Sequence, residues 1–274
     1  MQTLTQIDSW PARSAAVGVW RRGEHVASRG PTDARLRIAS VSKLLTGYAV
    51  MVAVEEGSVS LDDPVEPPGA TLRHLLAHAA GYGFDSDAAV LAAPGTRRIY
   101  SNRGIEEAAA HVARATGIAF ADYLAEAVLG PLQMSTTAVL GSPAFGVHST
   151  VTDLGRFVAE LFSPRLVAPS TLATMTTVQL PGLAGVLPGV RRYAPLDFGL
   201  AFERNFAKPG HWAGTQLSPA TFGHFGGSGT FLWLDPTIEL ACVMLADREF
   251  DEWGMTTWPS FCDDVVREAT GLTG

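Results

Sequence analysis

Charged residues are scarce in this chain, at 17% of its 274 positions, whereas hydrophobic residues make up 47%. Basic residues are fewer than acidic ones, since the chain has 20 Lys and Arg but 27 Asp and Glu. The formal net charge is −7, and no basic run occurs. Such a surface does not attract a phosphate backbone, so we expect no nucleic-acid partner. The same balance is typical of a compact globular enzyme with a large apolar core.

Cysteines and long apolar runs are also few. Cys242 and Cys262 lie in apolar or helical contexts, which favours small core residues over a disulfide or a metal pair. The best apolar run, residues 44–54, is too short to span a bilayer and is followed by two glutamates. The first residues lack the basic and apolar segments of a secretion signal. The sequence therefore predicts a reduced, cytoplasmic protein with no membrane partner.

Motifs that bind nucleotides are missing as well. The chain has neither a Walker A sequence nor a G-x-G-x-x-G that leads into a helix, so we expect no cofactor of this kind, and none of any other kind is indicated. The nucleophile elbow G-x-S-x-G is absent too, because residues 226–230 read GGSGT and Thr230 replaces the last glycine. This argues against an α/β-hydrolase.

The order of the secondary-structure signals predicts an α+β fold. Strand signals joined by a turn at Gly23 come first, helix signals dominate the middle, and strand signals return before a final helix. The expected strands are 14–20, 25–29, 197–203, 223–234 and 239–246. The expected helices are 40–56, 74–80, 105–116, 120–129, 149–161 (with Ser149 or Thr152 as N-cap), 169–175 and 259–270. Residues 1–56 plus 195–274 would form a lobe around an antiparallel sheet and residues 57–194 a mostly helical lobe, with the active site in the cleft between them.

The strongest local motif is an S-x-x-K that runs from Ser40 to Lys43, at the start of a predicted helix. Its spacing places both side chains on one helix face. A serine hydroxyl needs a neighbouring base, and a lysine can be that base if burial lowers its pKa. The helix N-terminus and the Ser40 N–H would favour an oxyanion. Two alternatives remain: Ser42, which points away from Lys43, as the nucleophile, or a capping serine followed by a surface lysine.

Three segments, the first of which contains this motif, resemble the serine β-lactamase-related family, which includes class C β-lactamases, DD-peptidases, β-lactamase-like carboxylesterases and D-aminopeptidases. The segments are 36–43 (LRIASVSK), 61–65 (LDDPV) and 72–81 (LRHLLAHAAG), and weaker similarities extend the resemblance over about residues 14–250. The resemblance implies the β-lactamase/DD-peptidase fold, which is also that of penicillin-binding-protein-like proteins. It also implies a serine hydrolase that forms an acyl-enzyme.

The second family motif is present as Tyr100-Ser101-Asn102, which resembles Y-x-N. A phenol held against the Lys43 cation can act as a base or an acid. The Asn102 amide both donates and accepts, which suits it to orient Lys43 and a substrate carbonyl. The alternative is a loop tyrosine and a turn asparagine in front of a helix.

The third family motif is present as His224-Phe225-Gly226, which resembles the K-T-G or H-T-G strand. The resemblance implies that His224 assists the site by tuning Tyr100 and that the Gly227 N–H is the second oxyanion donor. Gly226 and Gly227 allow a substrate to approach the backbone closely. A glycine-rich strand bend with a core histidine is the alternative.

The prediction is therefore a hydrolase in which Ser40 is the nucleophile and Lys43 and Tyr100 transfer its proton, with the choice of base left open. The substrate is a small molecule with an ester, amide or lactam group. In the family, the threonine at the position of Phe225 helps to bind the carboxylate of β-lactams and D-Ala-D-Ala substrates. Its replacement favours an uncharged ester over a β-lactam.

Other functions are kept as alternatives. The chain could be a β-lactamase or a D-amino-acid peptidase or amidase, or a non-catalytic homologue that binds a ligand or is acylated as a sensor. His74 and His78 have the i, i+4 spacing of metal ligands, but the glutamate of H-E-x-x-H and a third ligand are missing, so no metal site is expected. The sequence leaves the oligomeric state open.

Overall fold

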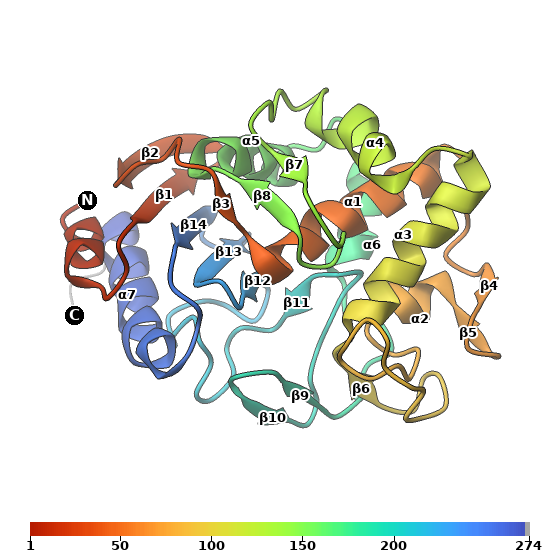
Figure 1. Cartoon of the computed structure of the whole chain (residues 1–274). Coiled ribbons are helices and arrows are strands. Elements are labelled where there is room, and N and C mark those ends of the chain that lie inside the picture. Colours follow the sequence, from red (N-terminus) through yellow and green to blue (C-terminus); the bar gives the residue numbers. More distant parts are fainter. Residues whose placement is uncertain (272–274) are drawn as a thin grey trace.

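The computed structural model describes residues 1–271 and has a central antiparallel sheet that joins the two ends of the chain (Figure 1). Its strands are β1 (Ala15–Arg21), β2 (Glu24–Arg29), β11 (Glu203–Arg204), β12 (Phe222–Gly226), β13 (Thr230–Asp235) and β14 (Leu240–Ala246). They lie in the order β11–β12–β13–β14–β1–β2. β1 pairs with β14 over its whole length, from Ala15 opposite Ala246 to Arg21 opposite Leu240.

Along β1, β13 and β14 both faces of this sheet are buried, because alternate side chains of these strands enter different cores, whereas the edge strand β2 is mostly exposed. On β1, Val17 and Val19 belong to the core with the C-terminal helix α7 (Glu252–Thr270), and Ala16 and Trp20 belong to the other core. The first core also contains the N-terminal turn η1 (Thr3–Ser9), and the second is built with α1 (Ser42–Glu55) and α5 (Val151–Phe162). In Figure 1, α7 lies on one side of the sheet and α1 and α5 lie on the other.

The rest of the chain forms a region with more helix and three small sheets. Its helices are α2 (Leu72–Leu76), α3 (Asn102–Thr116), α4 (Phe120–Leu124), which continues into a π turn η3 (Ala125–Leu129), and α6 (Pro169–Thr176). One sheet has β3 (Leu36–Arg37), β8 (Val147–Ser149) and β7 (Ala138–Val139). A second has β10 (Arg191–Tyr193), β9 (Gly185–Leu187) and β6 (Arg98–Ile99), and β4 (Pro64–Val65) pairs with β5 (Ala70–Thr71). Among the described residues, no helix combines the length and apolar character needed to cross a membrane.

Helix α1 is the buried helix that its sequence predicts, since all its residues from Ser42 to Ala53 are buried. It is preceded by a short 3-10 turn, η2 (Ala39–Val41), which carries Ser40. Ala39 has a φ of 44°, in the left-handed region that residues with a Cβ rarely adopt. The backbone is therefore strained directly before Ser40, a feature that clusters at functional sites.

Two predicted strands differ in the structure. Residues 197–203 were predicted as a strand, but only Glu203 lies in one (β11), because the segment's backbone bonds mostly with helices and loops: the Leu200 and Ala201 N–H groups donate to the carbonyls of Met175 and Leu76. The predicted strand 223–234 is a hairpin, β12 and β13, with a turn at residues 227–229. Its apolar pattern reflects burial and hides the turn.

Helix boundaries also differ. Neither Ser149 nor Thr152 caps α5; the cap is Thr150, whose hydroxyl accepts from the Asp153 N–H at 2.9 Å. Helix α7 starts seven residues before the predicted start, with Asp251 as its N-cap, and contains Pro259. The prediction that the cysteines are core residues is confirmed: Cys242 and Cys262 are free and buried.

Candidate active site

Ser40 and Lys43 lie together at the start of α1. Lys43 Nζ is 3.1 Å from Ser40 Oγ, 2.7 Å from Asn102 Oδ1 and 2.9 Å from the Ala144 carbonyl oxygen. These three contacts match the three protons of an ammonium group. Lys43 is fully buried, while Ser40 remains partly open to solvent. The structure thus brings together two of the predicted catalytic residues and the predicted orienting amide.

The charge of Lys43 is destabilised by its position. Burial lowers the pKa of Lys43 from 10.5 to about 7, although the nearby charge of Glu106 raises it in part. The free amine is therefore well populated near neutral pH. In that form, Nζ accepts a proton from the Ser40 hydroxyl at the same distance at which the ammonium group donates to it.

Ser42, the alternative nucleophile, is placed differently. It is fully buried, and its Oγ accepts a hydrogen bond from the Val147 N–H at 3.1 Å, which ties α1 to β8. The hydroxyl that lies against Lys43 and is partly exposed is that of Ser40.

Tyr100 lies between β6 and α3 and is buried against Lys43. Lys43 Nζ is 4.9 Å from the centroid of its ring. Burial raises the pKa of Tyr100 above its ordinary value of 10. A hydrogen bond with Ser40 acts in the opposite direction, and the charge of Glu203 adds to the increase. The phenol is therefore protonated at neutral pH, which suits a proton donor better than a phenolate base.

The segment that carries Tyr100 is held on both sides. The Ser101 hydroxyl caps α3 by accepting from the Gly104 N–H at 3.1 Å and donates to the Gly83 carbonyl at 2.7 Å. The buried Arg98 guanidinium donates to four backbone carbonyls, those of Ala77, Gln179, Leu180 and Leu196. Asn102 begins α3, so the helix cap fixes its side chain in front of Lys43.

His78 lies next to the site, and the sequence did not reveal that it contacts Tyr100. Its Nδ1 accepts from the Ser101 N–H at 3.2 Å, and its ring lies 4.5 Å from the Tyr100 ring at an interplanar angle of 33°. Its i−4 partner His74 instead caps α2 by contacts with Thr71. The two histidines thus serve different parts of the structure, and residues 1–271 hold no group of three or more His, Cys, Asp or Glu placed for a metal ion.

Strand β12 brings His224 to the other side of Tyr100. The ring centroids lie 5.5 Å apart, and the His224 Nδ1–H donates to the Phe225 carbonyl at 2.6 Å. Burial, together with the charge of Lys43, lowers the pKa of His224 to about 4, so the ring is neutral. Its buried Nε2 has no hydrogen-bond partner within residues 1–271. This nitrogen is an acceptor beside Tyr100.

Gly226 brings the end of β12 against Ile38 and Ala39, the two residues before Ser40. A Cβ at Gly226 would collide with the Ile38 carbonyl and the Thr230 hydroxyl, so only glycine allows this approach. Gly227 lies at the exposed end of the strand. In the described part of the chain, neither the Ser40 N–H nor the Gly227 N–H donates a hydrogen bond. These two free backbone donors are the groups available for the predicted oxyanion hole.

The position after His224 lacks a hydroxyl group. The Phe225 ring packs among aromatic side chains, with centroids 5.6 Å from Trp212 and 4.7 Å from Phe250. The nearest hydroxyls on the hairpin are already donated: Ser228 to the Arg37 carbonyl at 2.7 Å and Thr230 to the Ile38 carbonyl at 2.9 Å. These two bonds instead support the segment that leads to Ser40.

The residues before β12 form a buried charged cluster behind the site. Glu203 accepts from Lys208 Nζ at 3.1 Å, His211 Nε2 at 2.9 Å and Trp212 Nε1 at 3.1 Å. Burial alone would raise the pKa of Glu203, but these three partners together hold it below its ordinary value. The cluster keeps a carboxylate charged close to Tyr100.

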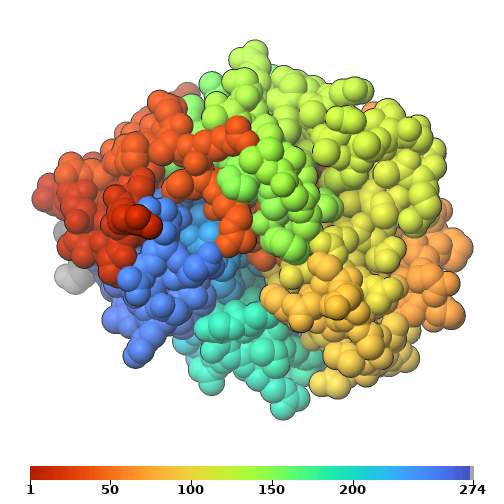
Figure 2. All heavy atoms as spheres, viewed as in Figure 1, coloured from red at the N-terminus to blue at the C-terminus, as the bar shows by residue number. Residues whose placement is uncertain are grey.

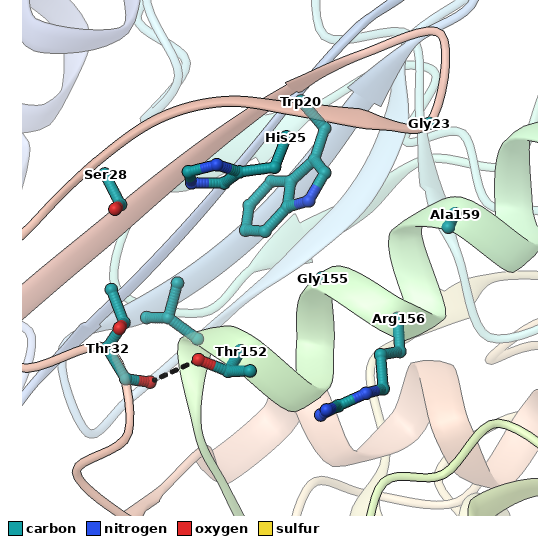
Figure 3. A pocket seen from close by; sticks show the side chains of 10 residues that line it. Trp20, Gly23, His25, Ser28, Thr32, Thr152, Gly155, Arg156 and Ala159 are labelled. Carbon is teal, nitrogen blue, oxygen red and sulfur yellow. Dashed lines mark hydrogen bonds between the residues drawn. The ribbon is translucent and has the colours of Figure 1, made fainter.

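Two cavities differ in their relation to this site. The first has a volume of about 550 Å³ and is lined by Tyr100 together with residues of segments 84–99 and 184–192. Figure 2 shows the gold and teal segments of these regions adjoining at the surface. The second, of about 450 Å³, lies between the β1–β2 hairpin and α5, where the Trp20 ring crosses Gly155 (Figure 3), and none of the predicted site residues lines it.

Comparison with known proteins gives both closer and more distant similarities. A crystal structure described as a beta-lactamase from Mycobacterium bovis is 46% identical, with a TM-score of 0.95, over 98% of this chain and 99% of that one. EstCE1, described as a hydrolase with promiscuous acyltransferase activity, shares the fold at 17% identity, with a TM-score of 0.77 over 96% of both chains.

Among curated proteins, the D-alanyl-D-alanine-carboxypeptidase/endopeptidase AmpH of Escherichia coli strain K12 is 28% identical over 176 residues, which is 51% of this chain and 45% of AmpH. The chain thus matches the curated relative over about half the length of each. The predicted β-lactamase/DD-peptidase-like α+β fold is confirmed by the solved structures. The Beta-lactamase family model matches residues 7–259, and the chain belongs to this family.

Proposed function

We propose that the protein is a serine hydrolase that forms an acyl-enzyme on Ser40 and acts on a small ester. The observation that carries the proposal is the 3.1 Å contact between Ser40 Oγ and Lys43 Nζ, in a site whose burial lowers the pKa of Lys43 to about 7. A nucleophile and a base of suitable pKa are thus already within hydrogen-bonding distance.

In the first step, Lys43 as a free amine takes the proton of Ser40 while Ser40 Oγ forms a bond with the substrate carbonyl carbon. The electron pair of the carbonyl π bond moves to the oxygen, and the Ser40 and Gly227 N–H groups donate to this oxyanion. Asn102 keeps Nζ aligned through its 2.7 Å contact. Lys43 is the base in this proposal because the pKa of Tyr100 is raised.

In the second step, the carbonyl re-forms, the bond to the leaving oxygen breaks, and this oxygen receives a proton. The proton originates from Ser40 and is held on Lys43, and the neutral hydroxyl of Tyr100, next to both, is the relay that delivers it. Water then attacks the acyl carbonyl and gives up a proton through Tyr100 to Lys43. Lys43 returns a proton to Ser40 Oγ as the acyl bond breaks, which releases the acid and restores Ser40.

The surroundings of β12 favour an ester over a β-lactam. A β-lactam antibiotic carries a carboxylate near its reactive carbonyl, and the family's threonine hydroxyl would help to bind it. Phe225 provides no such group, and the hydroxyls of Ser228 and Thr230 are donated to backbone carbonyls. A buried carboxylate without a partner is costly, so such substrates are disfavoured.

Mass spectrometry of the acylated protein tests this proposal. The protein is mixed with 4-nitrophenyl butyrate, quenched within seconds and digested with trypsin, which releases residues 38–43 as one peptide. We expect a butyryl group on this peptide, with fragmentation assigning it to Ser40 rather than Ser42.

Parallel reactions use a chromogenic cephalosporin and a D-Ala-D-Ala peptide. Turnover of either compound at a rate comparable to that of the ester would contradict the ester preference. If no ester acylated the protein and the protein hydrolysed no ester, the proposal itself would be contradicted.

The pH dependence of activity provides a test of Lys43 as the base. Glu106 lies on α3, one turn after Asn102, and its negative charge favours the ammonium form of Lys43. Glu106→Gln removes that charge, so the pKa of Lys43 falls and the free amine persists to lower pH. We expect the acidic limb of the kcat/KM profile to move to lower pH by about half a unit or more.

The matched control for this prediction is Glu107→Gln, which removes the same charge from the adjacent position, where the carboxylate lies 3.9 Å from Arg103. This variant is expected to keep the wild-type profile. An acidic limb that stays in place in Glu106→Gln, or moves to higher pH, would show that the group titrating there is not Lys43 in its amine form.

A further inference from the structure

The cavity beside Tyr100 has a built shape and opens next to the catalytic group. Its volume is about 550 Å³, and its walls come from the loop before β6, from β6 itself and from the β9–β10 hairpin. Among the described residues that line it, Tyr100 is the one that belongs to the proposed catalytic site. A substrate bonded to Ser40 can therefore extend into this cavity past the Tyr100 ring.

Large apolar side chains are exposed around this cavity. Phe84, Leu91 and Val186 line it and are 45%, 63% and 55% exposed. Phe84 also stacks on Tyr100, with centroids 5.8 Å apart. The backbone holds this loop in place, since the Asn102 N–H donates to the Phe84 carbonyl at 2.8 Å. Exposed apolar surface concentrated at a cavity marks a binding site for an apolar group.

The rim of the same cavity carries uncompensated positive charge. Arg97 and Arg192 line it, and both are exposed. Neither guanidinium forms an ion pair or a hydrogen bond with any residue of 1–271, although the Arg192 backbone pairs with Val186 in the β9–β10 hairpin. The third lining guanidinium, that of Arg98, is used up by backbone carbonyls. None of the described residues that line the cavity is acidic. A free guanidinium binds a carboxylate through two parallel hydrogen bonds, so this rim is complementary to an anion.

We propose that the cavity binds the distal part of the substrate: an apolar segment attached to the scissile ester and a carboxylate at its far end, held by Arg97 and Arg192. This inference rests on the proposed esterase function and names its substrate class. It places the anion several bonds from the reactive carbonyl, beyond Tyr100. At the β12 edge, where β-lactam carboxylates would lie, Phe225 supplies no hydroxyl.

Matched ester pairs test the proposal. In the first pair, the 4-nitrophenyl esters of adipic acid carry either a free carboxylate or its methyl ester on the acyl side. In the second, the acetate esters of 6-hydroxyhexanoic acid and of its methyl ester carry the same difference on the alcohol side. The proteins compared are the wild type, Arg97→Ala/Arg192→Ala and the control Arg13→Ala/Arg114→Ala, which removes two exposed arginines that do not line the cavity.

In at least one pair, we expect the wild type to prefer the anionic ester and Arg97→Ala/Arg192→Ala to lose about 10- to 100-fold in kcat/KM for it. The neutral ester should change less than about twofold, because apolar contacts remain, and the control variant should keep the wild-type preference. Equal kcat/KM for both members of both pairs, or an equal loss for anionic and neutral esters, would overturn the inference.

Binding to Ser40→Ala separates this inference from the proposed function. The affinities of monomethyl suberate and dimethyl suberate are measured by calorimetry, with and without the Arg97 and Arg192 substitutions. Tighter binding of the monoanion that depends on the two arginines would support the cavity assignment even if no ester were hydrolysed, in which case the esterase proposal alone would fail. No difference between the two ligands would overturn the assignment even if esters were hydrolysed.

Discussion

Ser40→Ala is expected to lower kcat/KM for 4-nitrophenyl butyrate by about 10³- to 10⁶-fold, the range found when the nucleophile of a serine hydrolase is removed. Covalent catalysis cannot proceed without the Oγ atom, and only the oxyanion donors and the binding cavity would remain. The residual rate should show no burst of 4-nitrophenol, because no acyl-enzyme accumulates. Stopped-flow absorbance measures both quantities.

The matched control is Ser42→Ala, two positions along the same helix start. Within residues 1–271, its hydroxyl has one contact, the hydrogen bond that it accepts from the Val147 N–H. We therefore expect a loss of stability of about 1–3 kcal/mol for the unpaired buried donor, with the burst retained in the folded protein. Thermal unfolding identifies the temperature at which both variants are folded. A burst in Ser40→Ala that disappears in Ser42→Ala would assign the nucleophile to Ser42 instead.

The sequence predicts the parts of this fold that local periodicity encodes. β1, β2 and β14 follow strand patterns with turn residues at their ends, and α1 is apolar around its whole circumference, so each was found close to its actual bounds. Residues 197–203 show why the rest could not be predicted. Their apolar pattern reflects burial, but their hydrogen-bond partners lie in α2 and α6, about 125 and 25 residues away in the chain. Periodicity contains no information on such partners.

For the site, the sequence predicts the residues that lie in short motifs. Ser40, Lys43, Tyr100 and Asn102 lie within contact distance in the structure, as the motifs indicate. Glu106, which modifies the pKa of Lys43, belongs to no motif, and its effect depends on the way α3 packs on α1. The cavity beside Tyr100 was equally hidden, because two segments about 90 residues apart form its walls.

Lys43→Met is the second substitution with a large expected effect, and it acts on activity and stability in opposite directions. Methionine fills a similar volume without a charge or a proton acceptor, so activity should fall by about 10³-fold or more as the base is lost. Stability should respond to pH, because the pKa of Lys43 is 10.5 in the unfolded chain and about 7 in the folded one. The unfolded chain therefore binds the extra proton between these two values.

The sign of this effect follows from proton linkage. Below pH 7, lysine is charged in both states, and the full cost of burying that charge opposes folding. As the pH rises from 7 towards 10.5, the folded protein holds the free amine while the unfolded chain still binds the proton. Each increase in pH makes that proton less favourable to bind, so the free energy of unfolding rises. The wild type should thus gain about 2–3 kcal/mol of stability relative to Lys43→Met between pH 6 and pH 9. At pH 6, Lys43→Met should be the more stable protein, although the unpaired Asn102 and Ala144 oxygens offset part of the difference.

Denaturant unfolding at pH 6, 7.5 and 9 measures this difference, with Ser40→Ala as the inactive control that retains Lys43. Ser40→Ala should follow the pH dependence of the wild type, which separates the loss of charge from the loss of activity. A constant stability difference between Lys43→Met and the wild type across this range would mean that Lys43 keeps its proton in the folded protein. It could not then act as the base for Ser40, and Tyr100 would have to take that role.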